Sequence, residues 1–136
     1  PTPIASITDP EGNPVPVTEA PCEQVVDPGL ANAMMTAMSK DDLPGGTAAN
    51  AARQVGWDRP MAGKTGTTQA NKSAAFLGYF PEISGAVITY DNDNRPDALC
   101  DGAGSPFACA RGNIFGGKTP AETWYGMMSP LFEGQP

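Results

Sequence analysis

The sequence predicts an α+β domain built around a small antiparallel sheet. Three stretches of strand-like composition follow one another closely, at 61–67, 73–80 and 85–90. The connections between them are too short for crossover helices, which favours antiparallel neighbours. Helical patterns lie on both sides of these strands, within a segment at 27–56 and in a closing helix at 119–131.

Length and charge narrow the classes of function. With 136 residues the chain is long enough for one domain with a real core. Its net charge of −7 makes nucleic acid and anionic membrane surfaces unfavourable partners. The absence of histidine excludes a Ser-His-Asp triad or a histidine metal site within the chain. No run approaches the ~20 apolar residues of a membrane helix, so we expect a soluble chain without a membrane segment.

The part before the sheet should contain a hairpin and two helices. Residues 1–17 combine two short apolar stretches with a dense turn signal, which predicts a β-hairpin. Asp27 and Pro28 are a favourable cap and first residue for a helix, and Thr47 is expected to cap a shorter one that ends at Gly56. One face of the first helix is apolar, and we interpret it as part of the core: Leu30, Ala33, Met34, Ala37 and Met38.

The sequence makes further predictions for the sheet and for the long loop that follows it. Apolar residues on both faces of 73–80 predict a central strand that is covered on both sides. The polar, glycine-rich segment 91–118 is expected to be a loop, in which Cys100 and Cys109 form a disulfide. That bond would place the chain in an oxidising compartment. Cys22 would then be unpaired, or bonded outside this chain.

The central motif is Lys64-Thr65-Gly66-Thr67-Thr68. Lys-Thr-Gly is one of three sequence elements of the serine penicillin-recognising enzymes. The ordered set around it resembles the C-terminal half of the transpeptidase domain of a class A, bifunctional penicillin-binding protein. The matching parts are the first hairpin, the helix from Pro28, Gly46-Thr47-Ala48, and residues 62–68, 75–81 and 116–128. The resemblance implies that 1–136 is part of a three-layer α/β/α fold, with a central antiparallel sheet covered by helices.

The same resemblance implies a chemistry for these residues. The family forms an acyl-serine intermediate with the peptidoglycan stem peptide, or with the β-lactams that mimic it. Lys64 would supply positive charge and assist proton movement, while Thr65 and Thr67 would offer hydroxyls to the substrate carboxylate. Thr68 would be a further substrate-binding residue. Gly66 would let the substrate backbone approach, and the Thr67 amide would be one oxyanion-hole donor. No cofactor or metal is implied.

The nucleophile is absent from this sequence. No serine is followed three positions later by lysine, and no Ser-x-Asn occurs. Tyr90-Asp91-Asn92 spells the Tyr-x-Asn variant of the second element, but it follows Lys-Thr-Gly instead of preceding it. We therefore expect this chain to be inactive alone, and its partner to be an N-terminal portion that carries the serine. The parent enzyme would be membrane-anchored and act at the extracytoplasmic face of the bacterial cell membrane.

Other interpretations remain open at this stage. The chain is alternatively a catalytically inert binding module, or part of a β-lactamase or D,D-carboxypeptidase of the same superfamily. Residues 112–119 fit the P-loop pattern G-x-x-x-x-G-K-[ST], although no convincing strand precedes them. Residues 91–94 (Asp-Asn-Asp-Asn) suggest calcium, but the glycine and glutamate of an EF-hand loop are missing.

Overall fold

The computed structural model describes residues 5–18, 21, 23–81, 83–92, 97–100 and 107–133, in two units. The first unit is Pro1–Ala31 and the second is Asn32–Pro136. In the first unit, β1 (Ile7–Thr8) pairs antiparallel with β2 (Pro14–Val15). This confirms a hairpin within 1–17, with shorter strands than the sequence pattern indicates, while residues 1–4 lie outside the described part.

Helix α1 (Pro28–Met38) begins where the sequence predicts. Asp27 Oδ1 accepts the backbone N–H groups of Gly29 and Leu30, at 2.8 and 3.2 Å. The helix contains no buried residue, and Met34 is 54% exposed. The prediction that its apolar face belongs to the core is therefore wrong for this chain, because burial of a helix face requires a neighbour that covers it.

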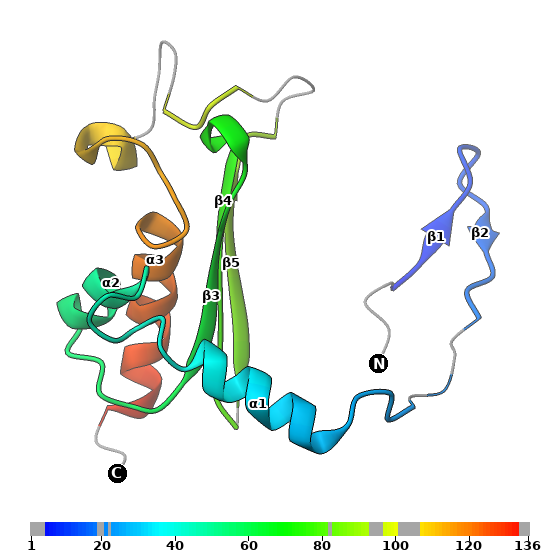
Figure 1. The fold of residues 1–136 in the computed structure, drawn as a ribbon. Coiled ribbons are helices and arrows are strands. Elements are labelled where there is room, and N and C mark those ends of the chain that lie inside the picture. Colours follow the sequence, from blue (N-terminus) through cyan, green and yellow to red (C-terminus); the bar gives the residue numbers. More distant parts are fainter. Residues whose placement is uncertain are drawn as a thin grey trace. The chain divides into compact units, whose positions relative to one another are not determined.

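The second unit is organised around a three-stranded sheet in the order β3-β4-β5. Strands β3 (Ala62–Thr67), β4 (Ser73–Tyr79) and β5 (Ser84–Tyr90) are all antiparallel to their neighbours (Figure 1). A short 3-10 turn, η1 (Gln69–Asn71), joins the first two. The predicted antiparallel sheet is confirmed, and the strand bounds agree within one residue.

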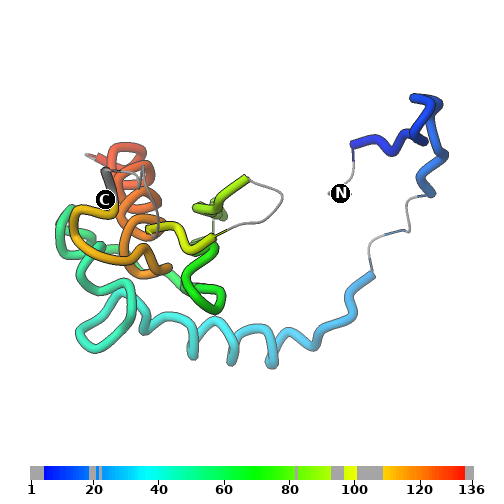
Figure 2. The backbone as a smooth tube through the Cα atoms, turned by 90° about the horizontal axis from the view of Figure 1, so that it is seen from above, coloured from blue at the N-terminus to red at the C-terminus, as the bar shows by residue number. Residues whose placement is uncertain are grey.

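Two helices cover one face of this sheet. Figures 1 and 2 show α2 (Ala49–Gln54) and α3 (Thr119–Met128) on the same side of it. The core between them contains Phe76, Trp124 and Tyr125, and the Phe76 and Trp124 rings meet edge to face with centroids 5.5 Å apart. A Cβ at Gly78 would lie 2.5 Å from the Trp124 ring, so glycine lets α3 pack this closely. The predicted closing helix is confirmed and continues as η3 (Ser129–Phe132).

The opposite side of the sheet, which carries Lys64, Leu77, Ile88 and Tyr90, is here termed the open face. Burial alternates along β4, with Ala74 and Phe76 buried and Leu77 51% exposed. Ile88 and Tyr90 of β5 are also exposed, at 62% and 64%. The prediction that β4 is covered on both sides is therefore wrong within this chain. The α+β class is confirmed, whereas the three-layer arrangement stays a prediction.

Near one end of the open face, the Tyr79 hydroxyl lies 3.6 Å from Met38 Sδ at the end of α1. Across the described ranges, no helix is both long enough and apolar enough to cross a bilayer.

Candidate functional site: the free edge of strand β3

Strand β3 is an outer strand of the sheet, and its register decides which backbone groups face outward. The Thr68 N–H donates to the Ser73 carbonyl at 2.9 Å, which makes these two residues a hydrogen-bonded pair. The preceding pair, Thr67 and Ala74, is then a non-hydrogen-bonded pair, whose N–H and C=O groups point away from the partner strand. The same holds for Thr65. The Thr65 and Thr67 amides therefore face the outer edge of β3, termed here the free edge.

Lys64 brings a positive charge to this edge. Its side chain starts on the open face, and its ammonium donates to the Thr65 carbonyl oxygen at 2.8 Å. Because that carbonyl points outward from β3, the Lys64 charge lies at the same edge as the Thr67 amide. Strand alternation places the Lys64 and Thr65 side chains on opposite faces of the sheet. Lys64 therefore meets Thr65 through the Thr65 carbonyl oxygen at the free edge.

Thr67 is held by a glycine loop that lies against β3 and β4. Its Oγ1 accepts the Gly116 N–H at 3.0 Å, so its own proton is left for donation. A Cβ at Gly116 would lie 2.5 Å from the Ala75 carbonyl oxygen and 2.7 Å from that of Gly66. Glycine is therefore what allows the loop to lie against β3. Sequence reasoning matched 116–128 to a closing helix and missed this contact, for which the Gly116-Gly117 pair was the available signal.

Thr65 contacts the loop that follows α1. Its Oγ1 lies 2.9 Å from Thr47 Oγ1, and the Thr47 hydroxyl donates to Asp41 Oδ1 at 2.5 Å. The prediction that Thr47 caps the second helix is wrong, because α2 has Ala48 at its cap position and no side-chain cap bond. The Thr47 hydroxyl is instead engaged by the Asp41 carboxylate. Gly56, with φ +65°, ends this helix as predicted.

Thr68 lies one residue beyond β3 and closes the turn into β4. Its hydroxyl donates to the Ser73 carbonyl at 3.2 Å and accepts the Ser73 N–H at 2.8 Å. These bonds direct the Thr68 hydroxyl into the turn. Its contact with a substrate stays a prediction.

A groove of about 980 Å³ borders the strand edge. Its wall is apolar where α1 and the following loop contribute Met34, Met38 and Leu43. Its polar lining includes Asp41, Thr47 and Lys64. The arrangement offers one cation and several hydrogen-bonding groups beside an apolar wall, which suits an anionic ligand with apolar substituents.

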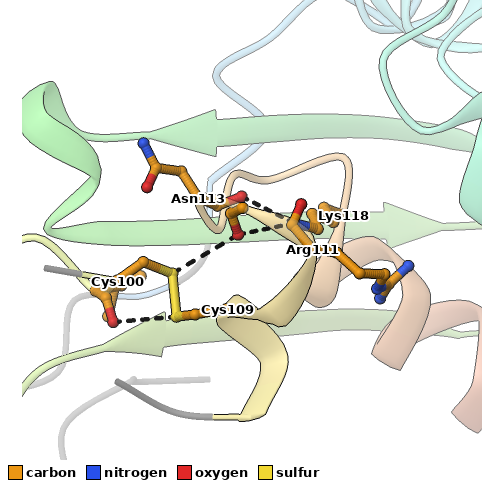
Figure 3. The surroundings of a disulfide bond; sticks show 7 residues. Cys100, Cys109, Arg111, Asn113 and Lys118 are labelled. Atoms are coloured by element: carbon orange, nitrogen blue, oxygen red, sulfur yellow. Dashed lines mark hydrogen bonds between the residues drawn. A yellow bond between two sulfur atoms is a disulfide. The ribbon is translucent and has the colours of Figure 1, made fainter. Parts of the chain in front are cut away.

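The predicted disulfide between Cys100 and Cys109 is present, with the two Cα atoms 5.5 Å apart (Figure 3). Cys100 Sγ lies 3.8 Å from the Gly112 carbonyl oxygen. Since disulfide sulfurs carry no proton, this is a packing contact. The bond ties residue 100 to η2 (Phe107–Arg111), which leads into the loop that reaches Thr67. Cys22 lies outside the described residues.

Lys118 stabilises the same loop from within. Its side chain is buried, and its ammonium donates to the carbonyl oxygens of Arg111, Gly112 and Asn113 at 2.7, 2.9 and 3.2 Å (Figure 3). The segment before the loop is a 3-10 helix, whereas a P-loop follows a strand. The lysine of the P-loop-like pattern therefore binds its own loop, which argues against nucleotide binding at 112–119.

Another cavity, of about 600 Å³, is lined partly by Thr47, Arg53, Arg111 and Glu122. Arg111 makes a bidentate ion pair with Glu122, at 3.0 and 2.6 Å. Hydrogen bonding to Arg111 lowers the pKa of the Glu122 carboxyl, and the same pairing raises the pKa of Arg111. Arg53 donates to Asn50. Both guanidinium groups thus have partners within the chain, so the cavity gives little reason to infer an anion site.

Within the described ranges, no three histidine, cysteine or acidic side chains are grouped so as to hold a metal ion. Of the acidic run 91–94, Asp93 and Asn94 lie outside those ranges. Comparison with protein-family models and with curated proteins finds no match to this chain.

Proposed function

We propose that this chain is the Lys-Thr-Gly-bearing portion of a peptidoglycan cross-linking D,D-transpeptidase that works through an acyl-serine and binds penicillin. The observation that carries the proposal is the free edge of β3. There the Lys64 ammonium contacts the outward Thr65 carbonyl, the Thr67 amide faces outward, and the Thr67 hydroxyl keeps its proton, all within four residues of one strand. The serine nucleophile belongs to a separate N-terminal portion of the same domain.

Each group has a role in acyl transfer. The stem peptide ends in a carboxylate, to which Lys64 offers charge and Thr67 a hydroxyl proton. The outward Thr67 N–H stabilises the developing oxyanion, together with the amide of the nucleophile. Gly66 has no side chain to obstruct a peptide that lies along β3 as an added strand.

The exposed apolar surface supports the presence of a partner portion. Leu77, Ile88 and Tyr90 on the open face, and Met34 on α1, are all more than half exposed. A partner portion that packs against these side chains would remove them from water and would complete the three-layer fold. The disulfide fits an extracytoplasmic enzyme, because such bonds persist in oxidising compartments.

A fluorescent penicillin tests the proposal. The purified 136-residue chain should stay unlabelled, and labelling should appear when the N-terminal portion is co-purified, with the adduct on a serine of that portion. Mass spectrometry of the separated polypeptides locates the adduct. Covalent labelling of the chain alone would contradict the proposal, because the nucleophile would then lie within it.

The same assay distinguishes related functions. A persistent acyl-enzyme that transfers its acyl group to an amine acceptor indicates a transpeptidase. Rapid hydrolysis indicates a β-lactamase or D,D-carboxypeptidase instead. An assembled complex that is never labelled identifies an inert binding module.

A further inference from the structure

Three oxygen atoms link Asp41 to Thr65 on the helix-covered side of β3. Thr47 Oγ1 lies between them, 2.5 Å from Asp41 Oδ1 and 2.9 Å from Thr65 Oγ1. The Thr47 backbone N–H also donates to Asp41 Oδ1, at 3.1 Å, and the Ala48 N–H donates to the Asp41 carbonyl at 3.0 Å. Asp41 thus orders the whole turn that presents Thr47 to the strand.

The chemistry of these groups fixes the direction of the protons. An ionised carboxylate only accepts hydrogen bonds, so the single hydroxyl proton of Thr47 goes to Asp41. The bond between the two threonines must then use the Thr65 proton. Within the described part of the chain, Asp41 Oδ2 is buried without a hydrogen-bond partner. The interactions of the carboxylate are therefore concentrated on Oδ1, the oxygen that engages Thr47.

Thr67 has the opposite hydrogen-bonding polarity. Its Oγ1 accepts the Gly116 N–H, so its proton is left for donation. Thr65 and Thr67 are two residues apart, so their side chains share one face of β3 about 7 Å apart. This face of β3 thus carries one hydroxyl that offers lone pairs and one that offers a proton.

We propose that Asp41, acting through Thr47, is a positioning residue that makes Thr65 a hydrogen-bond acceptor toward the ligand. Its consequence for the ligand rests on the proposed function. A peptide along β3 gives a backbone N–H to Thr65, while its carboxylate binds Thr67 and Lys64. The site therefore prefers a peptide C-terminus that keeps the backbone N–H donated to Thr65. A peptide in which that nitrogen is alkylated should bind more weakly.

The proton direction is measurable in this chain without ligand. In a ¹³C-labelled sample, NMR identifies the carbon to which the hydroxyl proton shared by the two threonines is coupled. We expect coupling to Thr65, and about tenfold faster exchange of that proton in Thr47→Val and Asp41→Ala, since one hydrogen bond is lost. Thr47→Ser should retain slow exchange. Thr36→Val is the matched control, because the Thr36 hydroxyl bonds the Asn32 carbonyl within α1.

A shared proton coupled to Thr47, or unchanged Thr65 exchange in Thr47→Val, would overturn the positioning role. The wild-type measurement decides even if a variant fails to fold. A second measurement, on the complex with the N-terminal portion, compares the dissociation constants of N-acetyl-D-alanyl-D-alanine and its N-methylated form. Asp41→Ala should reduce the preference for the N–H form about tenfold, the ratio expected for one hydrogen bond. If neither peptide binds wild type, the ligand of the proposed function is wrong, and the NMR result alone judges Asp41.

Discussion

At the scale of single residues, Lys64 is a position where a substitution should change the reaction rate without changing the stability of the fold. Its side chain is exposed, and its ammonium contacts one backbone carbonyl. Under the proposed transpeptidase function, we expect Lys64→Ala in the complex with the N-terminal portion to slow penicillin acylation about 10²–10³-fold, because a preorganised charge would be removed from the reacting centre. Stopped-flow fluorescence measures this rate. Lys72→Ala, at another exposed lysine, is the control, and equal rates in the two variants would remove Lys64 from the mechanism.

Phe76 is the complementary case, where a residue serves the fold alone. It is fully buried between β4 and α3 and contacts the Trp124 and Tyr125 rings. Phe76→Ala should lower the free energy of unfolding by about 3–5 kcal/mol, through lost burial and the cavity left behind. Denaturant titration of the chain tests this value. Leu77→Ala changes the next residue, on the open face, and should cost less than about 1 kcal/mol.

The sequence predicted the strand that carries Lys64 and Thr67 but not the hydrogen bonds around it. Lys64 and Thr67 could be placed on an edge strand because the motif is local. The contacts of Thr65 with Thr47, and of Thr67 with Gly116, join residues 18 and 49 positions apart. No local pattern specifies such pairs. A threonine before a helix predicts a cap. Only the fold shows that the Thr47 hydroxyl donates to Asp41 instead.

At the scale of elements, the glycine loop and strand β3 form one unit. A Cβ at position 116 would overlap the backbone of both β3 and β4, neither of which moves easily. Gly116→Ala should destabilise the chain by about 1–3 kcal/mol and release the Thr67 hydroxyl. Thermal unfolding and the amide shift of residue 116 report the two effects.

The matched control is Gly126→Ala in α3, where a Cβ would meet nothing within 4 Å. Removing a glycine from a helix should stabilise the chain by about 0.5–1 kcal/mol. If both alanine variants behaved alike, the close approach at Gly116 would have no energetic consequence.

Elements were predictable to the extent that their signals are local. The strand-like composition and short connections at 62–90 specified the sheet, and Asp27-Pro28 specified the start of α1. Burial was not predictable in the same way. The apolar faces of α1 and β4 indicate that something covers them, but an amphipathic pattern does not reveal whether that partner lies in the same chain.

At the scale of the whole molecule, acid should weaken the fold partly through Glu122. Its pKa is lowered by hydrogen bonding to Arg111, so its contribution is fully present above the unfolded-state pKa and is lost as pH falls through the folded-state value. Glu122→Gln should cost up to about 1 kcal/mol at pH 7, a modest value because Arg111 is largely exposed.

The difference between Glu122→Gln and wild type should then shrink as pH falls below about 4, the ordinary glutamate range. Urea titrations at several pH values measure it. Asp42 acts in the opposite sense, since burial raises the pKa of its carboxyl, but it is common to both proteins and cancels in the comparison. A difference that grows in acid would contradict the ion-pair explanation.

The open face also determines how this polypeptide behaves when produced alone. Leu77, Ile88 and Tyr90 together expose apolar surface on the sheet. The outer strand β3 of that sheet also directs backbone N–H and C=O groups outward, where another strand can pair with them. Such a surface promotes self-association as concentration rises. We expect the isolated chain to form oligomers in concentrated solution, and co-expression with the proposed N-terminal portion to increase its soluble yield.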